Sequence, residues 1–271
     1  MEDRMKTIKT LIAASIVSLS MASISSAHTD HSQLEQAVAG EHRSAKNKAR
    51  DQYRHPQQTL EFFGFKSTMT VVEITPGGGW YTEILAPALK GSGKLIGAHY
   101  PDTNEDNYFS KSRKRLEKKL ASDAIFSEVS LSDFVPRQKS ELAPANTADM
   151  VLTFRNLHNW REEGVAQVFV DAHRALKAGG VLGVVEHRLP KGADAEKARG
   201  YVSQEKTIAQ AKAAGFKFVA SSEINANPKD LAQYKVWTLP PSLDVEEKDK
   251  EKYLAIGESD RMTLKFVKVA K

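Results

Sequence analysis

Short apolar runs rich in β-branched residues alternate with segments of helical periodicity along most of this 271-residue chain. Such alternation predicts a parallel β-sheet with right-handed crossovers and helices on both faces. A composition of 41% hydrophobic and 27% charged residues agrees with a packed globular domain. The expected strands are 69–76, 94–100, 124–131, 148–154, 181–186, 216–224 and 262–269, and the expected helices are 80–90, 108–120, 161–177 and 198–214.

The two ends of this pattern differ from its middle. Between Asn225 and Asp260 no long helical segment could carry a crossover, so the last two strands are predicted to be antiparallel, with this excursion over the site. Before the first strand, a charged helix-compatible stretch is interrupted at Pro56, which predicts extended geometry at His55. The pair Gly179-Gly180 is predicted to end the helix that precedes it.

The first 27 residues have the composition of a leader. Arg4, Lys6 and Lys9 precede an apolar run from Leu11 to Ile24, which predicts a signal peptide that is cleaved after Ala27 and a periplasmic or secreted protein. The run is shorter than the roughly 20 residues of a spanning helix, so we expect no stable membrane anchor. With no cysteine in the sequence, stability must come from the core.

The charge distribution bears on the partners. The net charge is +5, and much of the basic excess lies in 108–120, a pattern more typical of a solvated helix face than of a nucleic-acid site. His28, His31 and His42 lack carboxylate or cysteine partners in a fixed element, so we expect no metal site. We expect a small-molecule substrate and no nucleic acid, and the sequence leaves the oligomeric state open.

Three successive glycines, Gly77 to Gly79, follow the first expected strand. In open α/β sheets ligands bind beyond the carboxyl ends of the strands, and glycine lets the backbone approach them closely. A dinucleotide fingerprint would need glycine where Thr82 stands, and no P-loop ending is present. The turn is therefore either a ligand-binding loop of another kind or simply a tight connection between strand and helix.

Glu73 before this turn, and the segment LKAGGVL beginning at Leu176, resemble motifs of the class I S-adenosylmethionine-dependent methyltransferases. The resemblance extends from about Thr59 to the C-terminus. It is closest to an exported group of predicted methyltransferases with the patterns N-K-A-R-D…Y-R-H-P and E-I-x-P-G-G-G-W-Y. It implies an α/β Rossmann-like fold: a seven-stranded, mostly parallel sheet with helices on both faces and a C-terminal antiparallel strand pair. The expected parts are a signal peptide (1–27), an N-terminal helical or lid segment (28–58), and a methyltransferase-like domain (59–271) with an inserted loop region (226–259).

The resemblance also implies S-adenosylmethionine as cofactor. The family's second strand normally ends in an acidic residue for the ribose, whereas here either Asp102 reaches back or His99 substitutes, and Asp133 is placed to meet the adenine. The cofactor-binding residues that we expect are Glu73, Thr75, Pro76, Gly77, Gly78, Gly79, Trp80, Tyr81, His99, Asp102, Asp133, Arg155 and Asn156.

Methyl transfer depends mainly on positioning, with a general base where the acceptor must lose a proton. His158, in the loop after the fourth strand, is either that base or a contact to the cofactor, or else a helix cap. Glu186 and His187 after the fifth strand either face the acceptor with it or belong to a surface ion cluster. The expected catalytic residues are these three. Candidates for the substrate pocket or lid, some of which could equally be exposed helix charges or core aromatics, are Asn47, Arg50, Asp51, Tyr53, Arg54, His55, Arg188 and Tyr201, with Trp237 beside them.

The leading hypothesis is thus an S-adenosylmethionine-dependent methyltransferase that acts on a small molecule in the cell envelope. The alternative is a non-catalytic periplasmic binding protein that uses the same fold for an adenosine-like or aromatic ligand. A nicotinamide oxidoreductase is disfavoured by Thr82.

Overall fold

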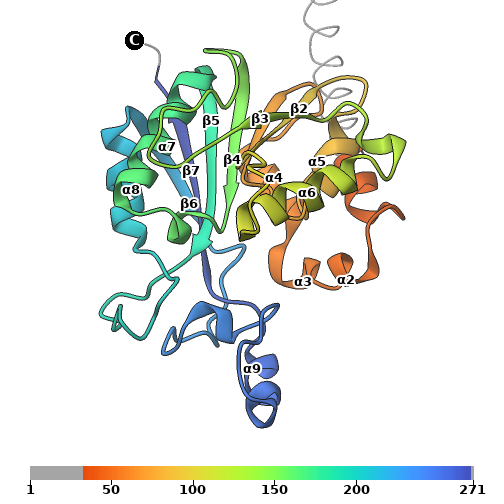
Figure 1. The fold of residues 1–271 in the computed structure, drawn as a ribbon. Coiled ribbons are helices and arrows are strands. Elements are labelled where there is room, and N and C mark those ends of the chain that lie inside the picture. The colour runs from red at the N-terminus through yellow and green to blue at the C-terminus, as the bar shows by residue number, and fades with distance from the viewer. Residues whose placement is uncertain (1–32, 270–271) are drawn as a thin grey trace, which may run out of the picture.

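A computed structural model describes residues 33–269 and shows one seven-stranded sheet in the order β3-β2-β1-β4-β5-β7-β6 (Figure 1). The five strands β1 to β5 pair in parallel, and β7 runs antiparallel to both of its neighbours. This topology confirms the predicted fold class. The strands are β1 (Thr70–Ile74), β2 (Lys94–His99), β3 (Ser130–Asp133), β4 (Ala148–Phe154), β5 (Leu176–His187), β6 (Phe216–Ser222) and β7 (Arg261–Lys268).

Helices cover both faces of the sheet. Val71 belongs to the core under α4 and α5, whereas Val72 and Ile74 belong to the core under α7 and α8, as the alternation of side chains along a strand requires. Residues 33–39 are also helical. The labelled helices are α2 (Ala45–Lys48), α3 (Asp51–Arg54), α4 (Pro56–Phe63), α5 (Thr82–Leu89), α6 (Tyr108–Leu120), α7 (Glu162–Ala175), α8 (Gln204–Ala213) and α9 (Lys250–Ile256).

The element bounds follow the sequence pattern most closely where caps or long apolar runs fix them. β4 and α6 have the predicted bounds. The third strand starts later than predicted because Ala124–Phe126 forms a short 3-10 helix, which the Asp123 side chain caps by accepting from the Ile125 amide. Likewise α8 starts only after Ser203, whose hydroxyl accepts from the Lys206 amide.

Two local predictions were wrong. Gly179 and Gly180 do not end α7, because the helix stops at Leu176 and both glycines lie within β5, where the pairing with β4 shifts register. His55 is left-handed rather than extended, with φ 38° and ψ 56°. This conformation lets the His55 amide close α3 on Asp51 while its carbonyl accepts from the Thr59 amide of α4.

The carboxyl ends of β1, β4 and β5 face one end of the molecule. Two segments far apart in the sequence lie at that same end: α2 and α3 on one side, and the excursion between β6 and β7 with α9 on the other (Figure 1). None of the helices among residues 33–269 has the length and apolar character needed to cross a bilayer. The predicted leader with Ala27, and also His28 and His31, lie outside the described residues.

Candidate functional site

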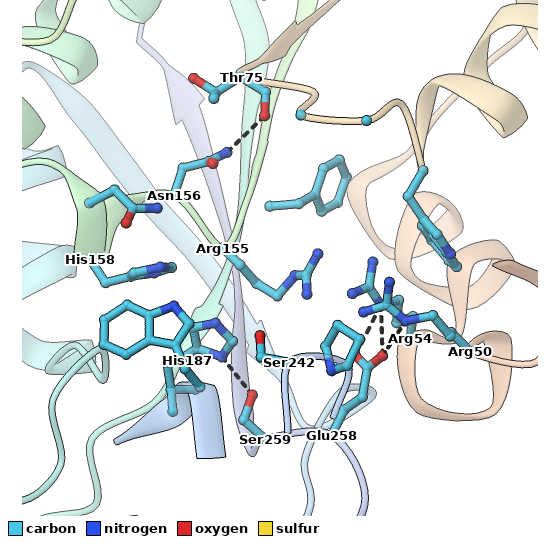
Figure 2. Close-up of a pocket in the computed structure, with 18 of the residues that line it drawn as sticks. Arg50, Arg54, Thr75, Arg155, Asn156, His158, His187, Ser242, Glu258 and Ser259 are labelled. Carbon is cyan, nitrogen blue, oxygen red and sulfur yellow. Dashed lines mark hydrogen bonds and ion pairs between the residues drawn. The ribbon is translucent and has the colours of Figure 1, made fainter. Parts of the chain in front are cut away.

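A cavity of about 660 Å³ lies at the carboxyl ends of these strands (Figure 2). Its walls come from the turn after β1, the loop after β4, the end of β5, the N-terminal helices and the β6–β7 excursion. The volume is in the range of small-molecule binding sites, and the position is the one at which open α/β sheets bind ligands.

The turn after β1 presents bare backbone to this cavity. Gly77 and Gly78 line it, and a Cβ built on either would meet no atom within 4 Å. Positive φ angles at Thr75 (51°) and Gly77 (60°) turn the chain there. Gly79 differs, because its Cβ would lie 2.9 Å from Cδ of Lys119 in α6, so Gly79 supports helix packing and does not line the cavity.

Thr75 contributes a second feature to this wall. Its Oγ1 atom is buried and has no hydrogen-bond partner among the described residues, although Thr75 lines the cavity. A buried hydroxyl without a partner is rare in a native fold, and a ligand in the cavity would supply one. The predicted neighbours Pro76 and Trp80 also line the cavity.

Glu73 lies behind the turn and does not line the cavity. It is 3% exposed, and its Oε2 accepts from the Thr82 hydroxyl at 2.7 Å. Burial raises the pKa of Glu73 to about 7, and the Thr82 hydrogen bond opposes the rise. Tyr81 is placed similarly, since its ring stacks on Phe154 with 3.5 Å between centroids.

The three predicted catalytic residues come together at the ends of β4 and β5. Glu186 Oε1 lies 3.0 Å from Nδ1 of His158, and the two imidazole centroids of His158 and His187 are 5.0 Å apart. Glu186 is fully buried, whereas both histidines line the cavity. Because a carboxylate only accepts, Nδ1 of His158 carries the proton, which leaves Nε2 as a base.

His187 is held as a neutral imidazole. Its Nδ1 lies 2.5 Å from Oγ of Ser259, in the excursion. Burial lowers the pKa of His187 well below its usual range, and the electrostatic influence of the neighbouring His158 and Arg155 lowers it further. His187 therefore offers a hydrogen-bonding group and no charge at neutral pH.

The atoms of His158, Glu186 and His187 that could ligate a metal all lie within 4.8 Å of one another. However, both oxygens of Glu186 already accept backbone hydrogen bonds, Oε2 from the Leu157 amide at 2.6 Å and Oε1 from the His187 amide at 2.8 Å. This pattern suits a carboxylate that orients an imidazole better than one that ligates a cation.

Arginine side chains form the opposite wall. Arg50 and Arg54 both donate through Nε to Glu258, at 2.6 Å and 3.0 Å, and the Arg54 guanidinium lies 4.6 Å from the Trp80 ring centroid. Burial alone would raise the pKa of Glu258, but the charges of the surrounding arginines, Arg54 first, lower it to about 2. Arg155 extends into the same space and forms no hydrogen bond to the described residues through its side chain (Figure 2).

The end of β2 forms a smaller hollow of about 50 Å³, lined by His99. His99 is buried, and its Nε2 lies 3.2 Å from Oγ of Ser112, while burial lowers its pKa. Asp102 instead forms an ion pair with Lys114, and Asp133 pairs with Arg113. Of the two candidates for the ribose, His99 is therefore the one at a hollow.

The remaining predicted residues divide by distance from the cavity. Asn47 and Asn156 line it, as does Trp237. The others do not: Asp51 pairs with Arg43, the ring of Tyr53 packs against Gly257, His55 joins two helices, Arg188 binds Glu223 and Asp260, and the Tyr201 hydroxyl donates to Asp230.

Sequence reasoning missed several residues of the cavity wall. Glu258 and Ser259 lie in the excursion, which the sequence predicts over the site, but no local pattern marks these two residues. Tyr108 and Phe109 belong to the helix read as a solvated face, and Phe109 stacks on Tyr100 with 4.0 Å between centroids. The one sequence feature that could have indicated these two residues is that an aromatic pair stands at the start of an otherwise basic helix.

Comparison with solved structures identifies the fold. A SAM-dependent methyltransferase from Aquifex aeolicus superposes with a TM-score of 0.57 at 16% identity, over 82% of this chain and 93% of that one. The [4+2]-cyclase SpnF superposes with a TM-score of 0.58 at 16% identity, over 91% of this chain and 95% of that one. A scan against protein-family models finds no match. A search of curated proteins also finds none.

The chain therefore has the Rossmann-like fold of the class I SAM-dependent methyltransferases. At these identities the likeness concerns the fold, and the cyclase among the neighbours shows that one fold serves more than one reaction. The reaction of this protein must be argued from its own cavity.

Proposed function

We propose that this protein is an S-adenosylmethionine-dependent methyltransferase that acts on a small-molecule acceptor, with His158 as general base. The observation that carries the proposal is the pairing of two features across one cavity. Bare backbone at Gly77 and Gly78 lines one part of it, and the imidazole of His158, oriented by Glu186, lines another.

The residues present fit the cofactor. The glycine turn leaves room for a ligand against the main chain, and Thr75 Oγ1 at this turn has no hydrogen-bond partner among the described residues. Asn156 fixes the opposite side of this turn, because its amide donates to the carbonyl of Ile74 at 3.0 Å. The hollow at His99 shares Thr75 and Gly77 with the main cavity, so one elongated ligand could occupy both.

When bound, S-adenosylmethionine supplies a methyl group on a positively charged sulfur, which keeps the C–S electron pair as the acceptor's lone pair forms the new bond. His158 Nε2 would take the proton that an oxygen or nitrogen acceptor loses. Glu186 would stabilise the imidazolium so formed through Nδ1. Trp237 lies next to His158, with 5.9 Å between their ring centroids.

The test is titration calorimetry with S-adenosylhomocysteine, followed by a labelled-methyl assay over a panel of small acceptors. His158→Gln should lower the transfer rate about 10²- to 10⁴-fold and leave the affinity for S-adenosylhomocysteine within about twofold. His173→Gln on α7, outside the cavity, is the matched control and should keep the full rate. Binding without transfer to any acceptor would favour the non-catalytic binding protein.

We further propose that the protein works in the cell envelope, as a member of the exported group that its sequence resembles. This rests on the basic and apolar leader that ends at Ala27. The N-terminal sequence of the protein recovered from the periplasm or medium should begin at His28. Recovery of an unprocessed chain from the cytoplasm alone would contradict the proposal.

A further inference from the structure

The arginine wall of the cavity carries more positive charge than the protein neutralises. Arg50, Arg54 and Arg155 line the cavity, and among the described lining residues Glu258 is the only carboxylate. Arg261 lies directly behind and shares Glu258, at 3.1 Å. Glu258 in the lining and the buried Glu186, which also acts on Arg155, are thus two carboxylates against four guanidinium groups.

The hydrogen bonds leave definite atoms free. Glu258 accepts hydrogen bonds from Nε of Arg50 and from Nε of Arg54. The Nη2 atom of each arginine is buried and has no partner among the described residues. Arg54 is only 2% exposed, although it lines the cavity. By contrast, Arg261 is satisfied, because it also donates to the carbonyls of Tyr53 and Ser259.

These groups are held in place before any ligand arrives. The face of Trp80 lies under the Arg54 guanidinium, and Glu258 fixes the inner edges of both Arg50 and Arg54. Figure 2 shows Arg155 extending toward them from the end of β4. Fixed guanidinium groups with free terminal nitrogens are suited to a planar or tetrahedral oxyanion, which they bind by charge-assisted hydrogen bonds.

From this arrangement we infer that the methyl acceptor is an oxyanion, a carboxylate or phosphate compound, whose charged group binds between Arg50, Arg54 and Arg155. This inference rests on the proposed function. The cofactor carries a sulfonium, an ammonium and one carboxylate, so its binding adds net positive charge to a wall that is already cationic. Its single carboxylate could satisfy one or two guanidinium groups, and an anionic acceptor supplies the remaining partner and charge.

The other walls indicate the body of that acceptor. Phe154 and Trp237 line the same cavity, together with the consecutive prolines Pro240 and Pro241. These flat apolar surfaces suit a ring or another planar group. A molecule with an oxyanion at the arginine wall would then place its nucleophile toward His158.

The test uses benzoate, phenyl phosphate and the uncharged isostere benzamide as probes, titrated into the protein saturated with S-adenosylhomocysteine at constant ionic strength. At least one of the two anions should bind about tenfold or more tightly than benzamide. The tighter of the two shows whether the site prefers a carboxylate or a phosphate. Equal binding of benzamide, or no anion binding up to about 10 mM, overturns the inference.

Variants locate the effect. Arg155→Gln should remove the preference for anions and leave benzamide affinity unchanged, and its lack of hydrogen bonds to the described residues makes it the least disruptive choice. Should it fail to fold, Arg50→Gln tests the same expectation. Arg174→Gln on α7 is the control and should keep the preference. If the arginine variants weaken S-adenosylhomocysteine binding but leave the preference for anions intact, these arginines serve the cofactor and the inference fails.

S-adenosylhomocysteine titrated alone separates this inference from the proposed function. If it does not bind while benzoate or phenyl phosphate still depends on Arg155, the methyltransferase proposal fails and the oxyanion site stands. If it binds while the protein shows no preference for anions, the oxyanion site alone is refuted.

Discussion

Replacing Glu258 with glutamine removes the single carboxylate that Arg50, Arg54 and Arg261 share, while keeping its size and one acceptor oxygen. The arginines lower the pKa of Glu258 from 4.5 to about 2. A folded-state pKa below the unfolded value contributes stability above the unfolded pKa that is lost as the pH falls through the folded one. At about 1.4 kcal/mol per unit, Glu258 contributes about 3 kcal/mol at pH 7.

The assay is urea unfolding of the wild type and of Glu258→Gln at several pH values. At pH 7 the variant should be less stable by about 3 kcal/mol, or by roughly 6–12 °C in Tm. The difference should shrink to about 1.4 kcal/mol at pH 3, because below pH 4.5 the Glu258 carboxylate of the unfolded chain takes up a proton while that of the folded protein stays mostly ionised. Glu223→Gln is a matched control, since Glu223 is exposed and pairs with Arg188; its cost should stay below about 1 kcal/mol.

The reasoning would be refuted if the Glu258 variant were as stable as the Glu223 variant at pH 7, or if its deficit did not depend on pH. The first result would mean that the guanidinium groups lose no stabilising free energy when the charge of Glu258 is removed. The second would mean that the carboxylate acts through packing and not through its charge.

Two further predictions concern the turn after β1. Burial raises the pKa of Glu73 to about 7, so the wild type loses stability between pH 4.5 and 7, where this group ionises in the unfolded chain but stays protonated in the folded one. In urea unfolding, Glu73→Gln should therefore be more stable than the wild type by up to about 3 kcal/mol at pH 8 and equally stable at pH 4. Equal stability at both pH values would contradict this. Gly79→Ala should lower the free energy of unfolding by about 1–3 kcal/mol, because φ is 79° at this position and the new Cβ would lie 2.9 Å from Lys119. Gly78→Ala should change the free energy of unfolding by no more than about 0.5 kcal/mol and should instead weaken S-adenosylhomocysteine binding in calorimetry. A Gly78 variant less stable than the Gly79 variant would contradict this account of the turn.

The paired behaviour of Gly78 and Gly79 shows where sequence reasoning stops. The run of three glycines predicted a backbone that approaches a ligand, and the structure places Gly77 and Gly78 at the cavity. The sequence pattern could not distinguish Gly79 from the other two glycines, because its neighbours Leu116 and Lys119 belong to α6 and are brought there only by the packing of that helix. Similarly, Gly179-Gly180 looked like a helix end and became part of β5 because the strand pairing with β4 extends to Leu176.

The sequence by itself determined the alternation of strands and helices, the bounds of β4 and α6, the antiparallel end of the sheet and the loops that carry Thr75 and His158. These depend on periodicity and on turn residues, which act over a few neighbouring positions. Tertiary structure alone decided that Glu258 meets Arg54, 204 positions away, and that Asp51 and Tyr53 turn from the cavity while Arg50 faces it. The physical reason is that a buried charge pairs with an opposite charge that the order of the strands brings close to it, and no local pattern in the sequence encodes which residue that is.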